Sequence, residues 1–335
     1  MIKTGVIGYG YWGPNVVRNF NSSSDIKVLK ICDKNKDRRE IAGQDFPNIK
    51  IVGEADDIIR DKDISAAAIV TPVFTHYDLA KKLLLNGKHI FIEKPFTSNT
   101  KQADELIEIA ERKNLTIMVD HTFLFTGAVK KIKQIIEEGI LGNLYYYDSV
   151  RVNLGLFQHD INVIWDLIPH DISILNYVLG DLKPVSVNVA GCGHFKRGIE
   201  DVAYLNIKFE NDFNAHFHAN WLSPVKVRKT LIAGDKNMLV WNDLETDEKI
   251  KIYDRGVDIE TQEGIYSSLA QYRLGGMISP KVETMEALKV ETKYFADCLK
   301  NGRKPFNDGI AGRKVVRILE ASDISLKNDG NAVKL

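Results

Sequence analysis

The sequence predicts an α/β protein with two domains, an N-terminal doubly wound parallel sheet and a C-terminal α+β domain with a large, mostly antiparallel open sheet. Short apolar strands alternate with amphipathic helices over the first 120 residues, which is the rhythm of β-α-β units. After that point, successive strand patterns with hairpin-like turns replace this rhythm. Because 335 residues exceed the usual length of one domain, we expect domains at 1–121 and 122–335.

The elements of the first half follow from apolar runs and helical spacing. Runs such as I-S-A-A-A-I-V are typical of strands that are covered on both faces. Between the strands, apolar residues recur at helical spacing, as in A-D-E-L-I-E-I-A. We expect strands at Lys3–Gly8, Lys27–Asp33, Ser65–Val70, His89–Glu93 and Thr116–Asp120, with helices at His76–Asn86 and Lys101–Lys113.

The second half mixes helices with alternating strands. Residues 183–260 hold successive strand patterns, and residues 261–282 bear glycine and serine and are expected to be irregular. We also expect a strand at Leu144–Asn153 and helices at Gly127–Glu138, Val163–Leu179, Glu283–Lys300 and Gly309–Lys327. An open antiparallel sheet has a second face to cover, and we expect Phe217, Ala219 and Trp221 to lie on it. A homo-oligomer would bury that face.

Composition excludes several classes of protein. Hydrophobic residues make up 44% and charged residues 27%, which argues against disorder. Lys plus Arg equals Asp plus Glu at 45 each, so no nucleic-acid or membrane surface is indicated. The three cysteines are far apart and form neither a disulfide framework nor a metal-ligand pattern. No signal peptide or long apolar run is present, and we expect a cytoplasmic protein without a metal.

The most informative motif is a glycine fingerprint between the first predicted strand and the helix after it. In G-Y-G-Y-W-G, Gly8, Gly10 and Gly13 supply G-x-G-x-x-G, which places a dinucleotide pyrophosphate at a helix N-terminus. Asp33 follows Gly13 by twenty residues, at the end of the second strand, where a carboxylate binds ribose hydroxyls and repels a 2′-phosphate. NAD is therefore favoured over NADP. Lys34 and Lys36 are read as a solvated helix start, although they could soften the repulsion.

Further cofactor candidates lie within and beside this fingerprint. Tyr11 and Trp12 belong to the glycine loop itself. The segment T-P-V-F-T-H follows a strand, so Thr71, Pro72 and His76 are expected to border the cofactor, with a simple helix start as the alternative.

Two segments could carry chemistry. E-K-P-F ends a parallel strand, so Glu93 and Lys94 are expected beside the nicotinamide, where Lys94 could stabilise charge on a substrate oxygen. Pro95 could fix this turn through a cis bond, and an ordinary solvated turn is the alternative. In W-D-L-I-P-H-D, Asp166 and His170 are four residues apart and share a helix face, which suits a proton carrier and its acidic partner.

Two points about the second domain stay open. Pro169 would terminate or kink a helix begun at Val163, so the helix could instead start at Pro169. Arg151 and Asn153 lie where a strand could feed a cleft, and Arg151 could meet a substrate phosphate or lie on the surface. Walker-type, H-E-x-x-H and G-x-S-x-G motifs are absent, which leaves hydrolases and phosphotransferases without support.

These motifs together resemble the Gfo/Idh/MocA family of NAD(P)-dependent oxidoreductases. The resemblance rests on G-Y-G-Y-W-G with Asp33, T-P-V-F-T-H, E-K-P-F, D-L-I-P-H, P-F-N-D-G and A-S-D-I-S-L, and it spans essentially the whole chain. It implies a Rossmann domain joined to a domain whose open sheet mediates dimers or tetramers. By this resemblance Lys94 is the family's E-K-P lysine, His170 its catalytic histidine and Asp166 the acid of the D-x-x-x-H element. Lys94, Arg151, Asn153, Asp166 and His170 are accordingly the residues expected at the substrate.

The resemblance also suggests a substrate class. Segments such as W-D-L-I-P-H-D-I-S-I and H-T-F-L-F are similar to members linked with nucleotide-sugar and surface-polysaccharide pathways, including UDP-N-acetylglucosaminuronate 3-dehydrogenases and keto-sugar reductases. This chain has H-T-F-L-F at His121–Phe125 where members commonly have an H-x-x-R-F-like segment, so a substrate-facing arginine is absent from it. A nucleotide-linked sugar is favoured, with a free polyol or sugar dehydrogenase and a non-catalytic NAD-binding regulator as alternatives.

Overall fold

The computed structural model describes residues 1–155, 160–180, 182–195, 198–258 and 271–335. The chain divides into two compact units. Unit 1 comprises Met1–Phe125 and Met285–Arg317, and unit 2 comprises Thr126–Thr284 and Ile318–Leu335. The first boundary lies close to the predicted one, but the predicted second domain needs correction because residues 285–317 fold with unit 1.

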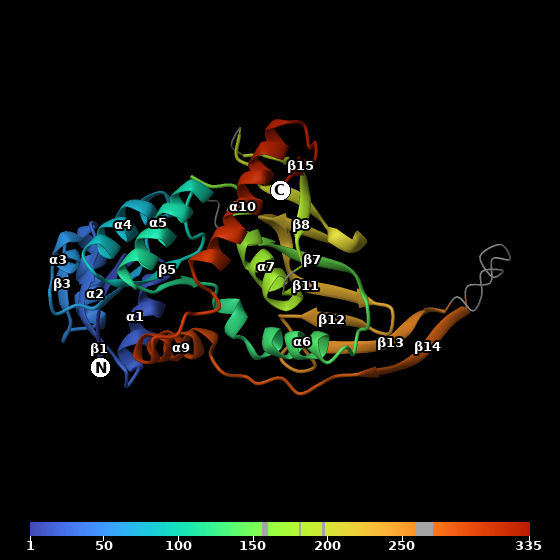
Figure 1. Cartoon of the computed structure of the whole chain (residues 1–335), viewed down its shortest axis with the longest axis horizontal. Coiled ribbons are helices and arrows are strands. Elements are labelled where there is room, and N and C mark those ends of the chain that lie inside the picture. Colours follow the sequence, from blue (N-terminus) through green and yellow to red (C-terminus); the bar gives the residue numbers. More distant parts are fainter. Residues whose placement is uncertain (156–159, 181, 196–197, 259–270) are drawn as a thin grey trace. The chain divides into compact units, whose positions relative to one another are not determined.

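Unit 1 is built on a six-stranded parallel sheet of order β3-β2-β1-β4-β5-β6. In Figure 1, α4 and α5 cover one face of this sheet, and α1 and α9 cover the other. The strands are β1 (Ile2–Ile7), β2 (Ile26–Cys32), β3 (Lys50–Val52), β4 (Ala66–Ile69), β5 (His89–Glu93) and β6 (Ile117–Asp120). The helices are α1 (Gly13–Ser22), α2 (Lys36–Asp45), α3 (Asp56–Ile59), η1 (Val73–Thr75), α4 (His76–Leu85), α5 (Thr100–Lys113), η2 (Thr122–Phe125) and α9 (Ala287–Asn301).

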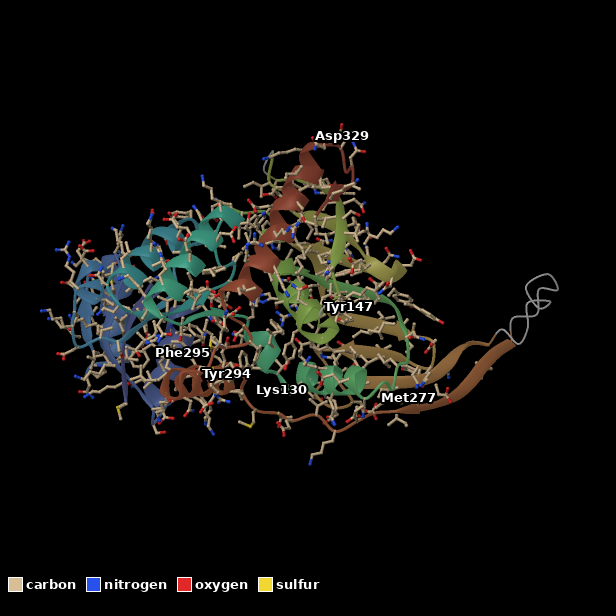
Figure 2. All side chains as sticks on the ribbon, in the orientation of Figure 1. Lys130, Tyr147, Met277, Tyr294, Phe295 and Asp329 are labelled. Carbon is tan, nitrogen blue, oxygen red and sulfur yellow. The ribbon has the colours of Figure 1, made fainter. Side chains whose placement is uncertain are left out.

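Aromatic packing explains why α9 belongs to unit 1. Phe295 of α9 stacks on Phe20 of α1 at 6.1 Å between ring centroids and meets the edge of Phe91 of β5 at 5.6 Å. The next residue, Tyr294, packs on Phe125 and Phe306. Figure 2 labels the side chains of Tyr294 and Phe295 on α9. Burial of such rings is the main gain from packing, so α9 completes the core of the parallel sheet despite its distance along the chain.

Unit 2 is built on a nine-stranded sheet of order β14-β13-β12-β11-β7-β10-β9-β8-β15. Its described neighbours pair antiparallel except β7 and β10, which pair parallel. The strands are β7 (Leu144–Leu154), β8 (Pro184–Cys192), β9 (Val202–Phe209), β10 (Asn214–Asn220), β11 (Leu222–Gly234), β12 (Met238–Asn242), β13 (Ile250–Asp258), β14 (Gln271–Ile278) and β15 (Val333–Lys334). The helices are α6 (Gly127–Glu137), α7 (Val163–Leu179), η3 (Glu210–Asp212) and α10 (Gly309–Lys327), which begins in unit 1.

The two-sheet α/β architecture is confirmed, but two predictions for unit 2 are wrong. Phe217, Ala219 and Trp221 are buried, because they face the side of the sheet on which α7 packs. The outer face carries Tyr204 instead, which is 44% exposed. Residues 271–278 form strand β14 rather than an irregular segment, because they pair with β13; residues 261–270 lie outside the described residues.

Candidate active site

The glycine loop at the end of β1 depends on two of its glycines for packing. Gly8 has φ +103°, and a Cβ atom there would lie 2.3 Å from the carbonyl oxygen of Val70. A Cβ on Gly13 would lie 2.7 Å from the carbonyl oxygen of Gly8. At Gly10, in contrast, no atom of the described residues, its chain neighbours aside, lies within 4 Å of a Cβ position. The middle glycine therefore borders open space, as it must where a pyrophosphate approaches the backbone.

Asp33 lies at the end of β2 and is held by backbone amides. Its Oδ2 accepts from the Tyr9 N–H at 2.7 Å, and its Oδ1 accepts from the Asn35 N–H at 2.8 Å. A carboxylate oxygen has room for a second donor, so both oxygens keep capacity for ribose hydroxyls. Lys36 points to Glu40 at 3.6 Å on the exposed side of α2, in agreement with its interpretation as a solvated helix start. These features fit a dinucleotide held by the glycine loop, the α1 N-terminus and Asp33.

The segment after β4 is braced by its own side chains. Thr71 and Thr75 share a hydrogen bond of 2.7 Å between their hydroxyl groups. His76 is fully buried, with Nε2 2.7 Å from the Thr71 carbonyl oxygen and Nδ1 2.9 Å from that of Pro95. Burial lowers the pKa of His76, and a neutral ring donates to only one of these carbonyls. The prediction that His76 contacts the cofactor needs correction, because its ring has no exposed surface and instead ties together the loops after β4 and β5.

Lys94 follows directly on β5, at the carboxyl edge of the parallel sheet. Its backbone N–H donates to Glu93 Oε2 at 2.9 Å, and its peptide bond to Pro95 is cis, as proposed. Its side chain is partly exposed. Lys94 therefore lies at the edge of the parallel sheet at which open α/β sheets bind their ligands, and its role in the site stays a prediction.

Glu93 belongs to a group of three acidic residues near this position, two of which the sequence did not single out. Glu93 lies opposite Asp120 in the register of β5 and β6, and Glu291 comes from α9. We call these three residues the carboxyl cluster. Burial, and next the charge of Asp120, raise the pKa of Glu93 and of Glu291 well above the usual range. The pairing of two acidic strand ends was visible in the sequence, whereas nothing local points to Glu291.

His121, next to the cluster, is 1% exposed, and burial lowers its pKa to about 4. Its ring is therefore neutral at physiological pH. His121 lies four residues before Phe125, where the first segment of unit 1 ends.

In unit 2, Asp166 and His170 lie on α7, which runs unbroken through Pro169 from Val163 to Leu179. The Asn162 side chain caps its start by accepting from the Trp165 N–H at 3.1 Å. The alternative start at Pro169 is therefore wrong, and Asp166 and His170 share one helix face. Asp166 Oδ2 accepts from the Trp221 indole at 3.0 Å, which fixes the carboxylate.

Arg151 lies on β7, and its side chain is buried. Its Nε and Nη2 donate to the two oxygens of Asp171 at 2.6 and 3.1 Å, and Ser149 donates to the same carboxylate. The predicted substrate-phosphate contact needs correction, because the guanidinium is committed to a carboxylate of its own chain. Asn153, two residues on, is partly exposed near the end of β7.

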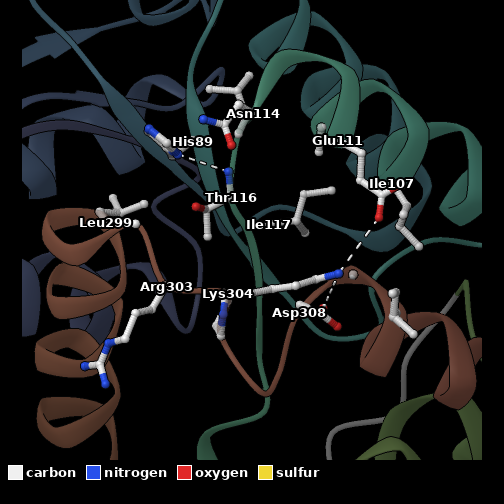
Figure 3. Close-up of a pocket in the computed structure, with 16 residues that line it drawn as sticks. His89, Ile107, Glu111, Asn114, Thr116, Ile117, Leu299, Arg303, Lys304 and Asp308 are labelled. Atoms are coloured by element: carbon white, nitrogen blue, oxygen red, sulfur yellow. Dashed lines mark hydrogen bonds and ion pairs between the residues drawn. The ribbon is translucent and has the colours of Figure 1, made fainter.

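A pocket of about 520 Å³ lies in unit 1 at the opposite, amino end of β5 and β6 (Figure 3). There His89 Nδ1 accepts from the Thr116 N–H at 3.0 Å. Lys304 lies 3.3 Å from Asp308 and 3.8 Å from Glu111. The pocket contains neither the glycine loop nor Lys94, so it is separate from the candidate active site.

Comparison with known protein families identifies the family of this chain and its class of activity. The family model described as "Oxidoreductase family, NAD-binding Rossmann fold" matches residues 2–121, and the GFO/IDH/MocA C-terminal domain matches residues 129–240. The chain belongs to the Gfo/Idh/MocA family. It is thus an NAD(P)-dependent dehydrogenase.

Several members of the Gfo/Idh/MocA family are similar over most of the chain. UDP-N-acetylglucosamine 3-dehydrogenase from Acidithiobacillus ferrooxidans is 28% identical over 330 residues, or 94% of each protein. Its solved structure superposes with a TM-score of 0.80 and 26% identity over 97% of this chain and 99% of that one. The scyllo-inositol 2-dehydrogenase (NAD(+)) of Bacillus subtilis is 25% identical over 91% of this chain and 88% of its own. An NADP(+)-dependent scyllo-inositol 2-dehydrogenase of the same organism is 26% identical over 56% of this chain and 54% of its own.

Two kinds of site are not found in the described parts of the chain. None of the described helices combines the length and apolar character needed to cross a membrane. Within the same ranges, no three His, Cys, Asp or Glu side chains are grouped as a metal site requires.

Proposed function

We propose that this member of the Gfo/Idh/MocA family transfers a hydride between NAD and a ring carbon of a nucleotide-linked sugar, such as a UDP- or dTDP-sugar, in nucleotide-sugar or surface-polysaccharide biosynthesis. The observation that carries the proposal is the similarity to UDP-N-acetylglucosamine 3-dehydrogenase along 94% of both proteins. The presence of Lys94 and His170, two groups suited to work on a hydroxyl oxygen and its proton, supports it.

The proposed roles follow from the chemistry of each side chain. When bound, the dinucleotide supplies a hydride acceptor or donor at C4 of its nicotinamide ring. His170 removes the proton of the reacting hydroxyl during oxidation and returns it during reduction. Lys94 donates a hydrogen bond to the same oxygen and stabilises its negative charge. Asp166, one turn before His170 on α7 and fixed by Trp221, favours the protonated imidazole.

NAD rather than NADP is the proposed cofactor. Asp33 is anchored by two backbone amides, so it stays in place as an acceptor for ribose hydroxyls. A 2′-phosphate would meet this carboxylate at close range, and like charges repel strongly where water is scarce. Gly8, Gly10 and Gly13 with the α1 N-terminus would hold the pyrophosphate.

A second candidate substrate is a free polyol or sugar, because inositol dehydrogenases are also similar along most of the chain. The third candidate, a non-catalytic NAD-binding regulator, is set aside because the similar family members are dehydrogenases.

NADH formation over a panel of UDP-sugars, dTDP-sugars and free polyols separates these candidates. We expect turnover with a nucleotide-linked sugar, and His170→Ala is the matched control that exposes a contaminating dehydrogenase. Turnover of polyols alone would overturn the substrate proposal, and so would NAD binding without turnover of any nucleotide-linked sugar.

We also propose a homo-oligomer that forms through the outer face of the unit 2 sheet. Tyr146 and Tyr204 are 37% and 44% exposed there, and Tyr204 stacks on His218 at 4.5 Å. Such a row of exposed rings is typical of a face that another subunit covers. Sedimentation at micromolar concentration tests this, and a monomeric mass would contradict it. The expected cytoplasmic location stays a prediction.

A further inference from the structure

The carboxyl cluster is too buried for all of its members to be ionised. Glu291 has no exposed surface, and Asp120 is 1% exposed. Glu93 lies opposite Asp120 at the ends of two paired strands. Carboxylates brought this close in a buried place repel each other, and one of them stays protonated instead. The cluster therefore holds at least one proton, and the hydrogen bonds indicate which carboxyl group carries it.

Asp120 is the member that accepts a hydrogen bond on each of its two oxygens. Its Oδ2 accepts from the Trp12 indole N–H at 3.2 Å, and its Oδ1 accepts from the Thr122 hydroxyl. Donors on both oxygens favour the charged form of a carboxyl group. Each carboxylate oxygen has room for a second donor, so Asp120 can still accept a further hydrogen bond.

Glu291 is the member best placed to hold the proton. Its Oε1 accepts from Asn307 Nδ2 at 3.2 Å, whereas its Oε2 has no hydrogen-bond partner among the described residues. The Thr122 hydroxyl acts in the opposite direction and lowers the pKa of this carboxyl group, but it is the least of the causes. Burial comes first among the causes that raise its pKa, followed by the charge of Asp120 and a hydrogen bond to it. The pKa of Glu93 is raised as well, but its Oε2 already accepts from the Lys94 N–H at 2.9 Å, and the charge of Lys94 acts against the rise.

We propose that Glu291 is a positioning residue of the NAD(P) site, in which a proton on Oε2 is shared with Asp120 and holds that carboxylate against the indole of Trp12. Trp12 stands directly before α1 in the glycine loop on β1, and β6 lies three strands away in the sheet order. The contact therefore ties the loop across β4 and β5. This inference concerns the dinucleotide loop and does not depend on which sugar reacts.

The arrangement makes the loop sensitive to a rise in pH. The ionisable neighbours of Glu291 in this region are Glu93, Lys94, Asp120 and His121, whose ring is neutral because burial lowers its pKa to about 4. Once Glu291 loses its proton, a second carboxylate repels Asp120 and the hold on Trp12 is lost. Because the folded-state pKa of Glu291 is raised, its stabilising effect is complete below about pH 4.3 and disappears as the pH rises through the folded-state value.

Calorimetric titration with NAD, at neutral and alkaline pH, tests the proposal on three variants. Glu291→Gln copies a protonated acid, so we expect near wild-type affinity at neutral pH and a smaller loss at alkaline pH. Glu291→Leu keeps the packing but cannot donate, and its affinity should fall about tenfold, the usual effect of losing a hydrogen bond to a charged group. Thr292→Val alters the next buried residue of α9, whose hydroxyl has no hydrogen-bond partner in the described part of the chain, and should bind NAD as wild type does.

A spectroscopic readout tests the proton itself. The infrared difference between wild type and Glu291→Gln at neutral pH should contain the C=O band of a protonated carboxyl group. Carboxylate bands alone in that difference would overturn the proposal. So would a tenfold loss of NAD affinity in Glu291→Gln, or an equal alkaline loss in this variant and wild type. If Glu291→Leu does not fold, the Gln variant and the infrared difference still decide.

Discussion

The glycine loop allows folding and cofactor binding to be separated with two single substitutions. At Gly8, an added methyl group would lie 2.3 Å from the Val70 carbonyl oxygen and 2.9 Å from Thr71 Cγ2, at a φ of +103°. The left-handed backbone costs roughly 1–2 kcal/mol for an L-residue, and the overlap with neighbouring backbone adds roughly 1–3 kcal/mol. We therefore expect Gly8→Ala to lower the free energy of unfolding by about 2–5 kcal/mol.

Gly10→Ala is the matched comparison, because no atom lies within 4 Å of its Cβ position. Its free energy of unfolding should stay within about 1 kcal/mol of wild type. The methyl group would occupy space that a pyrophosphate needs, so NAD affinity should fall about 5- to 100-fold, the equivalent of roughly 1–3 kcal/mol of steric cost.

Urea unfolding and calorimetric titration of both variants measure the two effects. Equal destabilisation by both substitutions would refute the packing argument. Undiminished NAD binding by Gly10→Ala would refute the place given to the pyrophosphate.

Three further substitutions test other residues. His170→Ala should lower kcat by roughly 10²–10⁴-fold with NAD affinity nearly unchanged, and steady-state kinetics showing activity within a few fold would exclude His170 as the proton carrier. Asp33→Asn removes the negative charge at the ribose, so the ratio of NADP to NAD affinity should rise; a constant ratio in titrations would contradict the ribose assignment. Arg151→Ala leaves Asp171 buried and uncompensated, and urea unfolding should show a loss of about 3–5 kcal/mol. A loss under about 1 kcal/mol would argue that the pair is not formed.

The sequence predicted elements well where a local pattern determines them. Both β5 and α7 have the predicted boundaries, and β1, β2, β4 and β6 start or end within about a residue of the predicted ones. In contrast, β3 has only three residues, too few for a period to appear, and it exists because it pairs with the end of β2. Pro169 fits inside α7 even though its ring removes a hydrogen bond, since the packing of a mostly buried helix outweighs that loss.

The residues that the sequence could not place depend on contacts between distant segments. Arg151 looked available for a phosphate because its partner, Asp171, lies twenty residues away on another element. Glu291 is one of many glutamates in amphipathic helices, and only the packing of α9 on the parallel sheet brings it to Asp120. Motif spacing therefore predicted the glycine loop and the strand ends. The side chains that support them could be placed only from the three-dimensional fold.

The residues between the glycines of the fingerprint also help to hold the loop in place. Tyr9 donates its N–H to Asp33 and its hydroxyl to Asp45 at 2.7 Å, on the β2 side of the loop, while Trp12 donates to Asp120 at the end of β6. Hydrogen bonds thus anchor the loop on both sides of β1, and the glycines allow the backbone to approach a pyrophosphate closely. A loop that is already ordered loses little conformational entropy when a ligand binds. The affinity of such a site therefore also depends on side chains that hold the loop without touching the cofactor. For this reason the charge state of Glu291, on α9, matters to a loop whose sequence motif consists of glycines.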